Sequence, residues 1–458
     1  MANCTSSQAR KEAFVAQMTQ RMAEVAQKLA DWVMTESRTL EEAEKMTLQN
    51  MKELGNAFLG SLLNLNVSAY PAQAVPCPCG QTATYQRMRP AHVTTLLGTI
   101  TLERPYYLCG GCHHGLAPLD QRLGLCAGGL SAGLEEILAL LGAQLPFEEA
   151  VGLVAKLTLV EVCPNTCKEA TEGVGQVIAQ KEQQAVEAAW DVRSSVLPTP
   201  PATIPERLYV SIDGTTVHIR GEGWKEIKVG AFYTTTTVAP KRRPEQLEVR
   251  AQAISFYTDF ADPQTFGRAL WLEGYRRGVS QAQEVVAIGD GAHWIWNLVE
   301  EHFPQAIQIV DWYHASEYIW KVAHAIYGEG SALAKQWAKN RLDELWEGQV
   351  DAVLRHCQEH ASAGEVVQQA ITYYTNNQAR MRYPEYRAKG LQIGSGTVES
   401  GCKHVIGARL KGAGMIWSLE GARAVAKVRA RLRSGRWAET MAQRPPPHRS
   451  YSYQRQAA

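Results

Sequence analysis

Apolar residues recur every three or four positions through the N-terminal part of the chain. Val15, Met18 and Met22 follow this spacing, with Glu, Gln, Lys and Ala between them, and the pattern resumes from about Leu40. Such spacing is typical of amphipathic helices. The pattern predicts a helical hairpin over residues 1–70, and an element of self-association is the alternative interpretation.

The pattern changes after this hairpin. Short β-rich stretches, 91–101 and 104–108, lie between turns rich in Cys, Gly and Pro. They predict a small β domain over 71–126, followed by a helical region over 127–193. A Pro-rich segment, 194–206, cannot continue a helix and is predicted to be a linker.

Beyond the linker, three adjacent strands precede an alternation of helices and strands. This order is typical of a mixed sheet with helices on its faces. Residues 315–388 are almost wholly helical, and 438–458 are predicted to form a disordered tail. The whole is therefore a multidomain α+β protein with its largest domain at 207–437. The predicted strands are 207–212, 228–236, 249–256, 285–288 and 306–310, and the helices between them are 263–277 and 293–302.

The composition fits this picture of several folded domains. The chain has 458 residues, of which 45% are hydrophobic and 20% charged, and two to four domains are the ordinary number for this length. No run of about 18 apolar residues predicts a membrane span. The polar N-terminus lacks the features of a secretory signal, so we expect a cytoplasmic protein.

The charge is balanced overall and concentrated locally. The formal net charge is +1, but the segment 403–436 holds nine Lys or Arg residues and a single acid, Glu420. Such a segment can neutralise phosphates whatever the total charge. A solvated basic helix is the alternative interpretation.

Four of the ten cysteines form two closely spaced pairs. Cys77-Pro-Cys79 and Cys109-Gly-Gly-Cys112 are separated by 29 residues. Two thiol pairs in tight turns, about one hairpin apart, indicate a structural zinc ion held by four thiolates. Four protein ligands leave no open position, which argues against catalysis by this ion. Cys163 and Cys167 could form another pair, but buried apolar residues are the favoured interpretation.

A helix, a break and a second helix are predicted between residues 145 and 178. The break is at 160–164, and Asn165 or Thr166 is the expected cap of the second helix. This outline is typical of a DNA-reading helix-turn-helix. Many ordinary helical hairpins share it.

Acidic residues follow the predicted strands of the C-terminal half. Asp213 and Asp290 each end a strand in Asp-Gly, which places a carboxylate at the C-terminal edge of the sheet. Glu399 lies at the start of a predicted helix, with Thr397 as its cap. Three such acids can hold two Mg²⁺ or Mn²⁺ ions about 4 Å apart and support phosphodiester chemistry. Asp311 closes the next strand and rivals Asp290, and a simple turn is the alternative for each Asp-Gly.

Several stretches together resemble a known family. The chain is similar to Asp–Asp–Glu transposases with a ribonuclease-H-like catalytic domain, and in particular to the ISKra-type insertion-sequence transposases, which are related to the Mutator-like group. The likeness covers most of residues 70–437. It is carried by SIDGT (211–215), IGDGAHWIW (288–296), IVDWYHASE (309–317), GSGTVES (394–400) and RLKGAGMIWS (409–418), and upstream by HVTTLLGTITLERPYYLC (92–109), PLDQRLGL (118–125) and LPFEEAV (145–151).

The resemblance implies roles for individual residues. Asp213, Asp290 and Glu399 would hold two Mg²⁺ or Mn²⁺ ions, and a helical insertion at about 315–388 would separate the last core strand from Glu399. Asp311 and His314 would form an accessory element that positions the second acid or touches DNA.

The resemblance also implies a function. The protein would bind double-stranded DNA at the terminal repeats of an insertion sequence, cleave it, and join 3′-hydroxyl ends to target DNA. Lys403, Arg409 and Lys411 are the expected DNA contacts. A homodimer or larger assembly, associated with a bacterial nucleoid, is expected because two ends must be joined.

Two other functions use the same features. A nuclease on this fold would share the acids, and a transposase-derived DNA-binding regulator would have no turnover. A phosphatase that forms an aspartyl-phosphate would need a second acid two residues from Asp213. Position 211 is Ser, which argues against that class.

Overall fold

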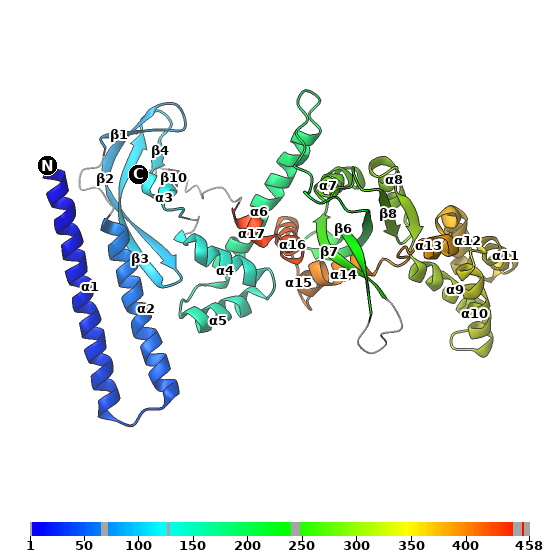
Figure 1. Cartoon of the computed structure of the whole chain (residues 1–458), viewed down its shortest axis with the longest axis horizontal. Coiled ribbons are helices and arrows are strands. Elements are labelled where there is room, and N and C mark those ends of the chain that lie inside the picture. Colours follow the sequence, from blue (N-terminus) through cyan, green and yellow to red (C-terminus); the bar gives the residue numbers. More distant parts are fainter. Residues whose placement is uncertain (1, 66–71, 126–128, 240–247, 443–450, 453–458) are drawn as a thin grey trace. The chain divides into compact units, whose positions relative to one another are not determined.

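The chain divides into two compact units. The computed structural model describes residues 2–65, 72–125, 129–239, 248–442 and 451–452. The N-terminal unit comprises residues Met1–Thr171 and Gln443–Ala458, and the C-terminal unit comprises Glu172–Ala442 (Figure 1). Each unit combines helices with one five-stranded sheet, so the protein has the mixed α+β character that the sequence predicts.

The N-terminal unit begins with the predicted helical hairpin, formed by α1 (Ala2–Thr35) and α2 (Leu40–Leu65). Thr39 and Glu42 form a reciprocal capping box: the Glu42 carboxylate accepts from the Thr39 backbone N–H at 2.8 Å, and the Thr39 hydroxyl accepts from the Glu42 N–H at 3.2 Å. These bonds satisfy backbone donors that a helix start leaves unpaired, so they fix where α2 begins.

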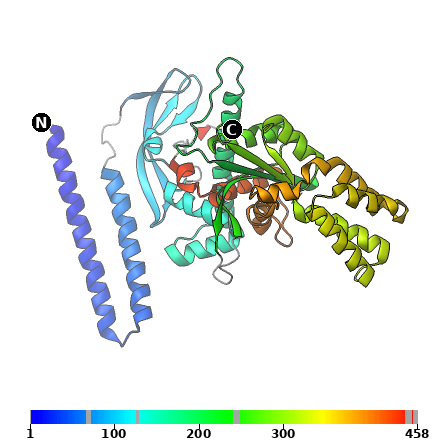
Figure 2. The ribbon, with the colours of Figure 1, turned by 45° about the vertical axis from the view of Figure 1, so that its right-hand side comes forward.

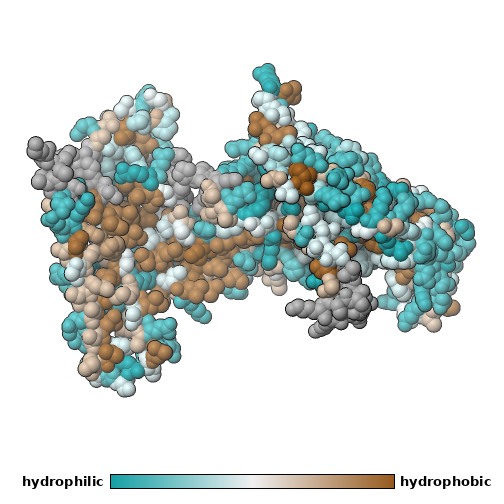
Figure 3. Space-filling model, in the orientation of Figure 1, coloured by the Kyte–Doolittle hydropathy of each residue, from teal (hydrophilic) through white to brown (hydrophobic). Residues whose placement is uncertain are grey.

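Apolar side chains remain exposed on this hairpin. Val15, Met22 and Leu48 are each at least half exposed. Figure 3 shows apolar surface over much of the N-terminal unit on the face in view. Exposed apolar patches often mark interaction sites, but the self-association element stays a prediction.

The first sheet follows the hairpin and has the order β1-β2-β3-β4-β10. The structure corrects the predicted stretch 91–101, because a turn at Leu96 and Leu97 divides it between two strands. Thr95 pairs with Gly98 across that turn. Two leucines give no turn signal, which is why the sequence pattern missed it. The strands are β1 (Ala74–Pro76), β2 (Thr82–Thr95), β3 (Gly98–Cys109), β4 (His114–Leu116) and β10 (Tyr451–Ser452).

Four helices follow β4 in the chain: α3 (Pro118–Arg122), α4 (Ala132–Gly142), α5 (Phe147–Thr158) and α6 (Pro164–Ala189). Residues of α4, α5 and the start of α6, among them Leu138 and Cys167, form one apolar core. The break between α5 and α6 matches the predicted helix, turn and helix. Asn165 and Thr166 lie inside the first turn of α6, so neither precedes it as the expected cap. DNA reading by these helices stays a prediction.

The C-terminal unit contains the predicted mixed sheet, in the order β7-β6-β5-β8-β9. β5, β6 and β7 pair antiparallel, whereas β8 and β9 run parallel to β5. The strands are β5 (Arg207–Ile219), β6 (Gly223–Val238), β7 (Glu248–Asp259), β8 (Glu284–Gly289) and β9 (Ile307–Val310).

Helices cover both faces of this sheet: α7 (Pro263–Arg276), α8 (His293–His302), α14 (Gly396–Gly401) and α16 (Leu419–Arg433). Gly230 of β6 lies against Leu270 of α7, so α7 packs on one face. Gly401 of α14 lies against Val229 and Phe256, which are on the opposite face. Because glycine has no side chain, each helix packs directly against the strands at these two contacts.

The predicted helical insertion lies between β9 and α14. Figure 2 shows it as a separate group of helices beside the sheet. Tyr383 donates its hydroxyl to the Val310 carbonyl at 3.1 Å, and Tyr386 donates to that of Gln308 at the same distance, so the insertion is bonded to β9. Its helices are α9 (Trp312–Tyr327), α10 (Ala332–Trp346), α11 (Val350–Glu359), α12 (Glu365–Asn377) and α13 (Tyr383–Ala388).

The predicted disordered tail is partly wrong. Residues 438–442 belong to helix α17 (Trp437–Ala442), and Tyr451 and Ser452 pair with β4. The rest of the predicted tail, 443–450 and 453–458, lies outside the described residues. Among the described helices, none is both long and apolar enough to cross a membrane.

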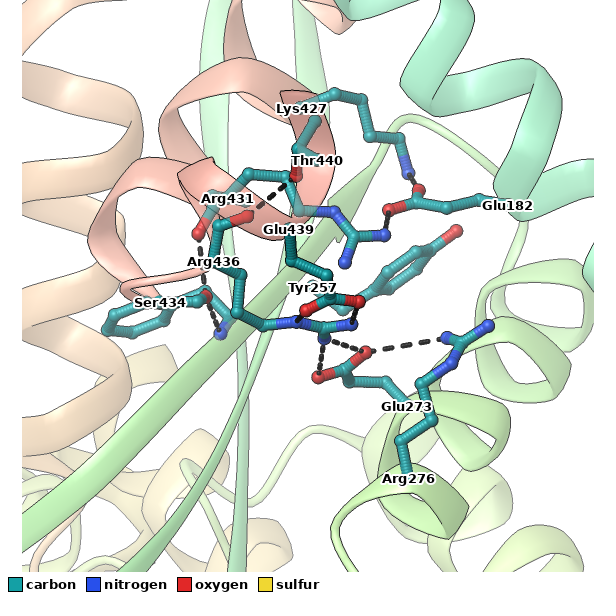
Figure 4. Close-up of polar contacts among 12 residues, drawn as sticks. Glu182, Tyr257, Glu273, Arg276, Lys427, Arg431, Ser434, Arg436, Glu439 and Thr440 are labelled. Atoms are coloured by element: carbon teal, nitrogen blue, oxygen red, sulfur yellow. Dashed lines mark hydrogen bonds and ion pairs between the residues drawn. The ribbon is translucent and has the colours of Figure 1, made fainter. Parts of the chain in front are cut away.

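Helix α16 carries much of the basic segment and is a buried helix. Lys427 is 2% exposed, and its ammonium lies 2.7 Å from the Glu182 carboxylate and 2.8 Å from that of Asp259. Arg431 also pairs with Glu182, and Arg436 with Glu273 (Figure 4). We call these residues, with Arg423, the α16 ion network. Both interpretations of the basic segment are therefore wrong for α16, whose cations mostly meet protein carboxylates.

Candidate active site

Three acids form a row at one edge of the C-terminal sheet. Ile212 of β5 pairs with Gly289 of β8, and Gly289 pairs with Val310 of β9. Asp213, Asp290 and Asp311 are the next residues on these three parallel strands. The predicted gathering of strand-end acids therefore follows from the register of the sheet.

Asp213 does not end its strand, contrary to the sequence prediction. β5 continues to Ile219, because its outer part stays paired with β6, and Asp213 itself pairs with Val229. The Asp-Gly dipeptide is therefore not a turn. Only the pairing of β5 with β8 stops before Asp213, which leaves its side chain at the edge of the parallel strands.

Asp213 is buried beside a second acid. Its carboxylate accepts from the Gly214 N–H at 2.7 Å and from the Cys402 thiol at 3.3 Å. Burial raises the pKa of Asp213 in spite of these two bonds, and the negative charge of Asp290 adds to the rise. A buried carboxylate next to a second acid is a natural place for a cation.

Asp290 follows β8 and keeps one carboxylate oxygen free. Its Oδ1 accepts from the Ala292 N–H at 2.8 Å, and its backbone carbonyl accepts from the Tyr373 hydroxyl at 2.9 Å. Among the described residues, no hydrogen-bond donor reaches its Oδ2. Gly291 has φ +105°, so a side chain there would be strained.

Asp311, the rival of Asp290, is fully occupied. It is 0% exposed and caps α9: Oδ1 accepts from the His314 N–H at 2.8 Å, and Oδ2 accepts from the Ser395 N–H. These bonds tie the start of α9 and the segment before α14 to the sheet. The geometry thus favours Asp290 over Asp311 as the acid with an available oxygen.

Glu399 arrives at this edge on α14. Its side chain is 48% exposed, accepts from the Ser395 hydroxyl at 2.8 Å, and lies 4.0 Å from Nε2 of His314. Ser395, and not the predicted Thr397, is the residue that precedes α14, although its side chain makes no capping bond. Thr397 lies in the first turn of the helix.

The structure does not gather the three predicted ligands into one tight set. Among the described residues of this unit, Asp311, His314 and Glu399 have potential ligand atoms within 4.8 Å of one another. Asp213 and Asp290 form the other half of the site. His314 belongs to the first half, with its Nε2 4.0 Å from the Glu399 carboxylate.

Cys402 is a site residue that the sequence analysis missed. It begins a π-helix, η4 (Cys402–Gly407), directly after α14, and such turns are frequent at functional sites. Burial raises the pKa of the Cys402 thiol, as does the nearby Asp213 carboxylate, so the thiol stays a proton donor to Asp213. Its position three residues after Glu399 was the one available signal, because i and i+3 share a helix face.

The three expected DNA contacts differ in exposure. Lys403 is exposed, and Lys411 is exposed and donates to the Thr215 hydroxyl beside Asp213. Arg409 is 2% exposed, with its guanidinium 4.8 Å from the centre of the Trp417 ring. A buried guanidinium cannot reach a phosphate, so Arg409 drops out of the set.

The N-terminal unit holds a separate thiol cluster. Cys77 Sγ lies 3.5 Å from Cys112 Sγ, Cys79 Sγ lies 3.6 Å from Cys109 Sγ, and all four atoms are within 4.8 Å of one another. Four thiolates around a zinc ion at about 2.3 Å would be roughly 3.8 Å apart. The cluster could therefore hold a structural metal such as zinc, consistent with a zinc ribbon.

The turns of the thiol cluster explain its geometry. Gly80 has φ +86° and donates to the Cys77 carbonyl at 3.0 Å, which folds the first turn tightly. A Cβ at Gly111 would lie 1.8 Å from the Gln81 side chain. Backbone N–H donation from Cys112 is the largest factor that lowers the pKa of Cys109 to about 6, whereas burial and the neighbouring thiols raise the pKa of Cys77 to about 12. Cys109 is therefore the member of the cluster in which the thiolate, the form that a metal requires, is favoured.

Comparison with known proteins reaches part of the chain. Residues 269–443 match the model of an uncharacterised protein family (UPF0236). The match includes Asp290, Asp311, His314 and Glu399, and excludes Asp213 and the thiol cluster. No curated protein matches the chain.

Proposed function

We propose that this protein is a DNA transposase of the ISKra type, with a ribonuclease-H-like catalytic domain in its C-terminal unit. The row of acids carries the proposal. Asp213 and Asp290 are the residues just beyond the parallel pairing of β5 with β8, and α14 brings Glu399 to the same edge after a helical insertion. This order of strand acid, strand acid, helical insertion and helix acid is the order that the resemblance implies.

The residues present suit divalent cations. Asp213 and Asp290 are carboxylates close enough for one to raise the pKa of the other, and Asp290 offers a free oxygen. Mg²⁺ and Mn²⁺ prefer such oxygen ligands. Bound there, two ions would supply an activated water or 3′-hydroxyl and stabilise the leaving oxygen in phosphodiester attack.

The surrounding residues then have distinct tasks. Asp213 and Asp290 hold the cations, and Glu399 completes the set from α14. Asp311 positions the others, because its bonds to His314 and Ser395 fix α9 and the approach to α14. Cleavage and strand joining are both in-line displacements, so one site serves both in succession.

The rest of the chain would deliver DNA to this site. The N-terminal hairpin, the thiol cluster and helices α5 and α6 would bind the terminal repeats of the element. Lys403 and Lys411, both exposed next to the site, would contact phosphates of the element or target DNA. A homodimer or larger assembly would bring two element ends together.

A labelled duplex that carries an element end tests the proposal. Wild type is expected to cut it with Mg²⁺ or Mn²⁺, and Asp213→Ala, Asp290→Ala and Glu399→Ala to lose about 10³-fold or more of the rate while still binding the end. Glu317→Ala is the matched control, because Glu317 is an exposed acid of α9 that pairs with Lys321 outside the site.

The outcomes separate the competing functions. Cutting without joining of 3′-hydroxyl ends to a target duplex would identify a nuclease. Binding of the end without cutting, under any divalent metal, would identify a transposase-derived regulator. If Asp290→Ala were active and Asp311→Ala inactive, the assignment of the second ligand would be reversed.

A further inference from the structure

A cavity of about 380 Å³ lies beside Asp290. It is bounded by the loop after β8 and by α9 and α12, and its walls include Ala292, His293, Tyr318, Thr372, Tyr373 and Asn377. The Tyr373 hydroxyl donates to the Asp290 carbonyl. The cavity wall is therefore bonded directly to a proposed cation ligand.

The walls combine two tyrosines and a histidine with uncharged amide and hydroxyl side chains, among them Gln368, Gln369 and Thr372. Tyr318 and Tyr373 stack with ring centres 4.0 Å apart and planes 21° from parallel. None of the described lining residues is an acid, a lysine or an arginine. The Lys321 ammonium lies 4.8 Å from the centre of the Tyr318 ring, just outside the cavity. Such a site suits a flat, uncharged ring with a phosphate close by.

One buried atom of the wall lacks a partner. Asn377 is 2% exposed, and its amide N–H group donates to the carbonyls of Tyr373 at 3.0 Å and Gly291 at 3.4 Å. Two carbonyl acceptors fix which end of the amide is nitrogen. Its Oδ1 is buried with no hydrogen-bond partner among the described residues. Buried acceptors are rarely left unpaired, so this oxygen points to a ligand that donates a hydrogen bond.

We propose that this cavity binds a nucleobase of an unpaired strand next to the scissile phosphate, with a preference for bases that carry an exocyclic amino group. Adenine, cytosine and guanine can donate such an N–H to Asn377, whereas thymine offers its N–H only between two carbonyl oxygens. The base stacks against the Tyr318 and Tyr373 wall, and Lys321 meets the adjoining phosphate. The inference rests on the proposed function, since it takes DNA as the substrate.

Two sets of short single-stranded oligonucleotides test the proposal. Fluorescein-labelled oligo-dA, oligo-dC and oligo-dT without 2-aminopurine measure the base preference, and wild type is expected to bind oligo-dA and oligo-dC more tightly than oligo-dT. An oligo-dT with one central 2-aminopurine measures stacking, and wild type is expected to quench its fluorescence. Tyr318→Leu is expected to abolish the quenching and weaken oligo-dA binding about tenfold. Trp320→Leu, a half-buried aromatic on the same helix outside the cavity, is the control and should change affinity less than twofold.

Two further variants protect the test against misfolding. Thr372→Met places a bulkier uncharged side chain in the cavity from an exposed position and should mimic Tyr318→Leu. Asn377→Ala should equalise oligo-dA and oligo-dT. Normal quenching in both Tyr318→Leu and Thr372→Met, with equal affinity of wild type for all bases, would overturn the inference.

Duplex cleavage by wild type is measured in parallel. Cleavage without quenching would reject the base site and leave the transposase intact. Quenching without cleavage would keep the base site and reject the catalytic function.

Discussion

The C-terminal unit contains two groups of partly or fully buried acids that differ in their surroundings. In the α16 ion network, each carboxylate faces a cation: Glu182 meets Lys427 and Arg431, and Asp259 meets Lys427. In the acid row, Asp213 faces Asp290. Burial raises the pKa of Glu182 and Asp259, but their cations and hydrogen bonds together outweigh it, so both pKa values fall. The cations are Lys427 and Arg431 at Glu182, and Lys427 and Arg423 at Asp259. The pKa of Asp213 rises.

This difference separates structural charge from functional charge. When a cation of the same chain faces a buried acid, the charge of that acid is neutralised and the pair holds two elements together. A buried acid that faces another acid lowers the stability of the fold until an external cation arrives. Perturbed groups of the second kind are concentrated at functional sites, which is why the acid row, and not the larger ion network, is the candidate active site.

The thiol cluster extends the comparison and carries the largest expected effect. Four thiolates also need an external cation, and structural zinc in small peptides contributes about 10–16 kcal/mol of apparent binding free energy. We expect about one zinc ion per chain by mass spectrometry, and its loss in Cys109→Ser. Cys357→Ser, a buried thiol outside the cluster, should retain the zinc. Equal zinc content in both variants would contradict a zinc site at Cys109.

Breaking the ion network should destabilise the C-terminal unit strongly. Lys427→Met removes the buried cation that Glu182 and Asp259 share, and we expect a loss of about 3–5 kcal/mol in the free energy of unfolding. Urea denaturation measures it. Arg433→Met is the control, since Arg433 is an exposed cation of the same helix, and it should change stability by less than about 0.5 kcal/mol. A loss below about 1 kcal/mol at Lys427 would mean that the network is not needed.

Divalent metal should stabilise the acid row and leave the ion network unaffected. At 100 times its dissociation constant, a bound cation adds about 2.7 kcal/mol to the free energy of unfolding. We expect Mg²⁺ or Mn²⁺ to raise the melting temperature of wild type but not of Asp290→Asn. In Lys427→Met, metal should raise the melting temperature as it does in wild type. An equal rise in wild type and Asp290→Asn would place the metal elsewhere.

Neutralising one acid in each group should have opposite signs. Without metal, Asp213→Asn removes an acid that destabilises the fold, and a gain of about 0.5–2 kcal/mol is expected, with loss of cleavage. Asp259→Asn removes a partner of Lys427 and should cost about 1–3 kcal/mol. Chemical denaturation compares the two, and a loss of stability in Asp213→Asn would contradict the comparison.

The smallest effect is a pH dependence of those differences. Because the folded pKa of Asp213 is raised, its destabilisation is present at neutral pH and is relieved as pH falls through that pKa, so Asp213→Asn should lose its advantage on acidification. Because the folded pKa of Asp259 is lowered, its stabilisation persists down to the ordinary aspartate pKa of about 3.9 and is lost only as pH falls further, through the folded pKa. Between pH 7 and 4.5, unfolding should therefore show the advantage of Asp213→Asn shrinking while the cost of Asp259→Asn stays constant.

Local pattern predicted the elements well and their long-range partners poorly. The predicted helix 293–302 coincides with α8, because its apolar period is visible within ten residues. The network was invisible, since Arg436 and Glu273 are 163 positions apart and nothing local distinguishes a paired arginine from a free one. For the same reason, the pattern could not show that Arg409 is buried.

The candidate site was predicted in outline. Asp213, Asp290 and Glu399 do reach one edge of the sheet, since acids after parallel strands share an edge. Glu399 nevertheless lies closest to Asp311 and His314. The sequence pattern does not predict the side-chain conformation that decides this. The continuation of β5 past Asp213 depends on pairing with β6, and the contact of Cys402 depends on a π-turn. Neither has a local signature.

The helical insertion has a consequence for the order in which the protein matures. Asp213 and Cys402, which touch in the finished site, are 189 positions apart, and Glu399 lies almost as far along the chain. At ordinary rates of about 5–20 residues per second, ribosomes need roughly 10–40 s to cover that distance. During this interval α9–α13 can fold through local contacts while the acid row waits for α14. A truncated product of translation would carry the strands and the insertion but no complete site.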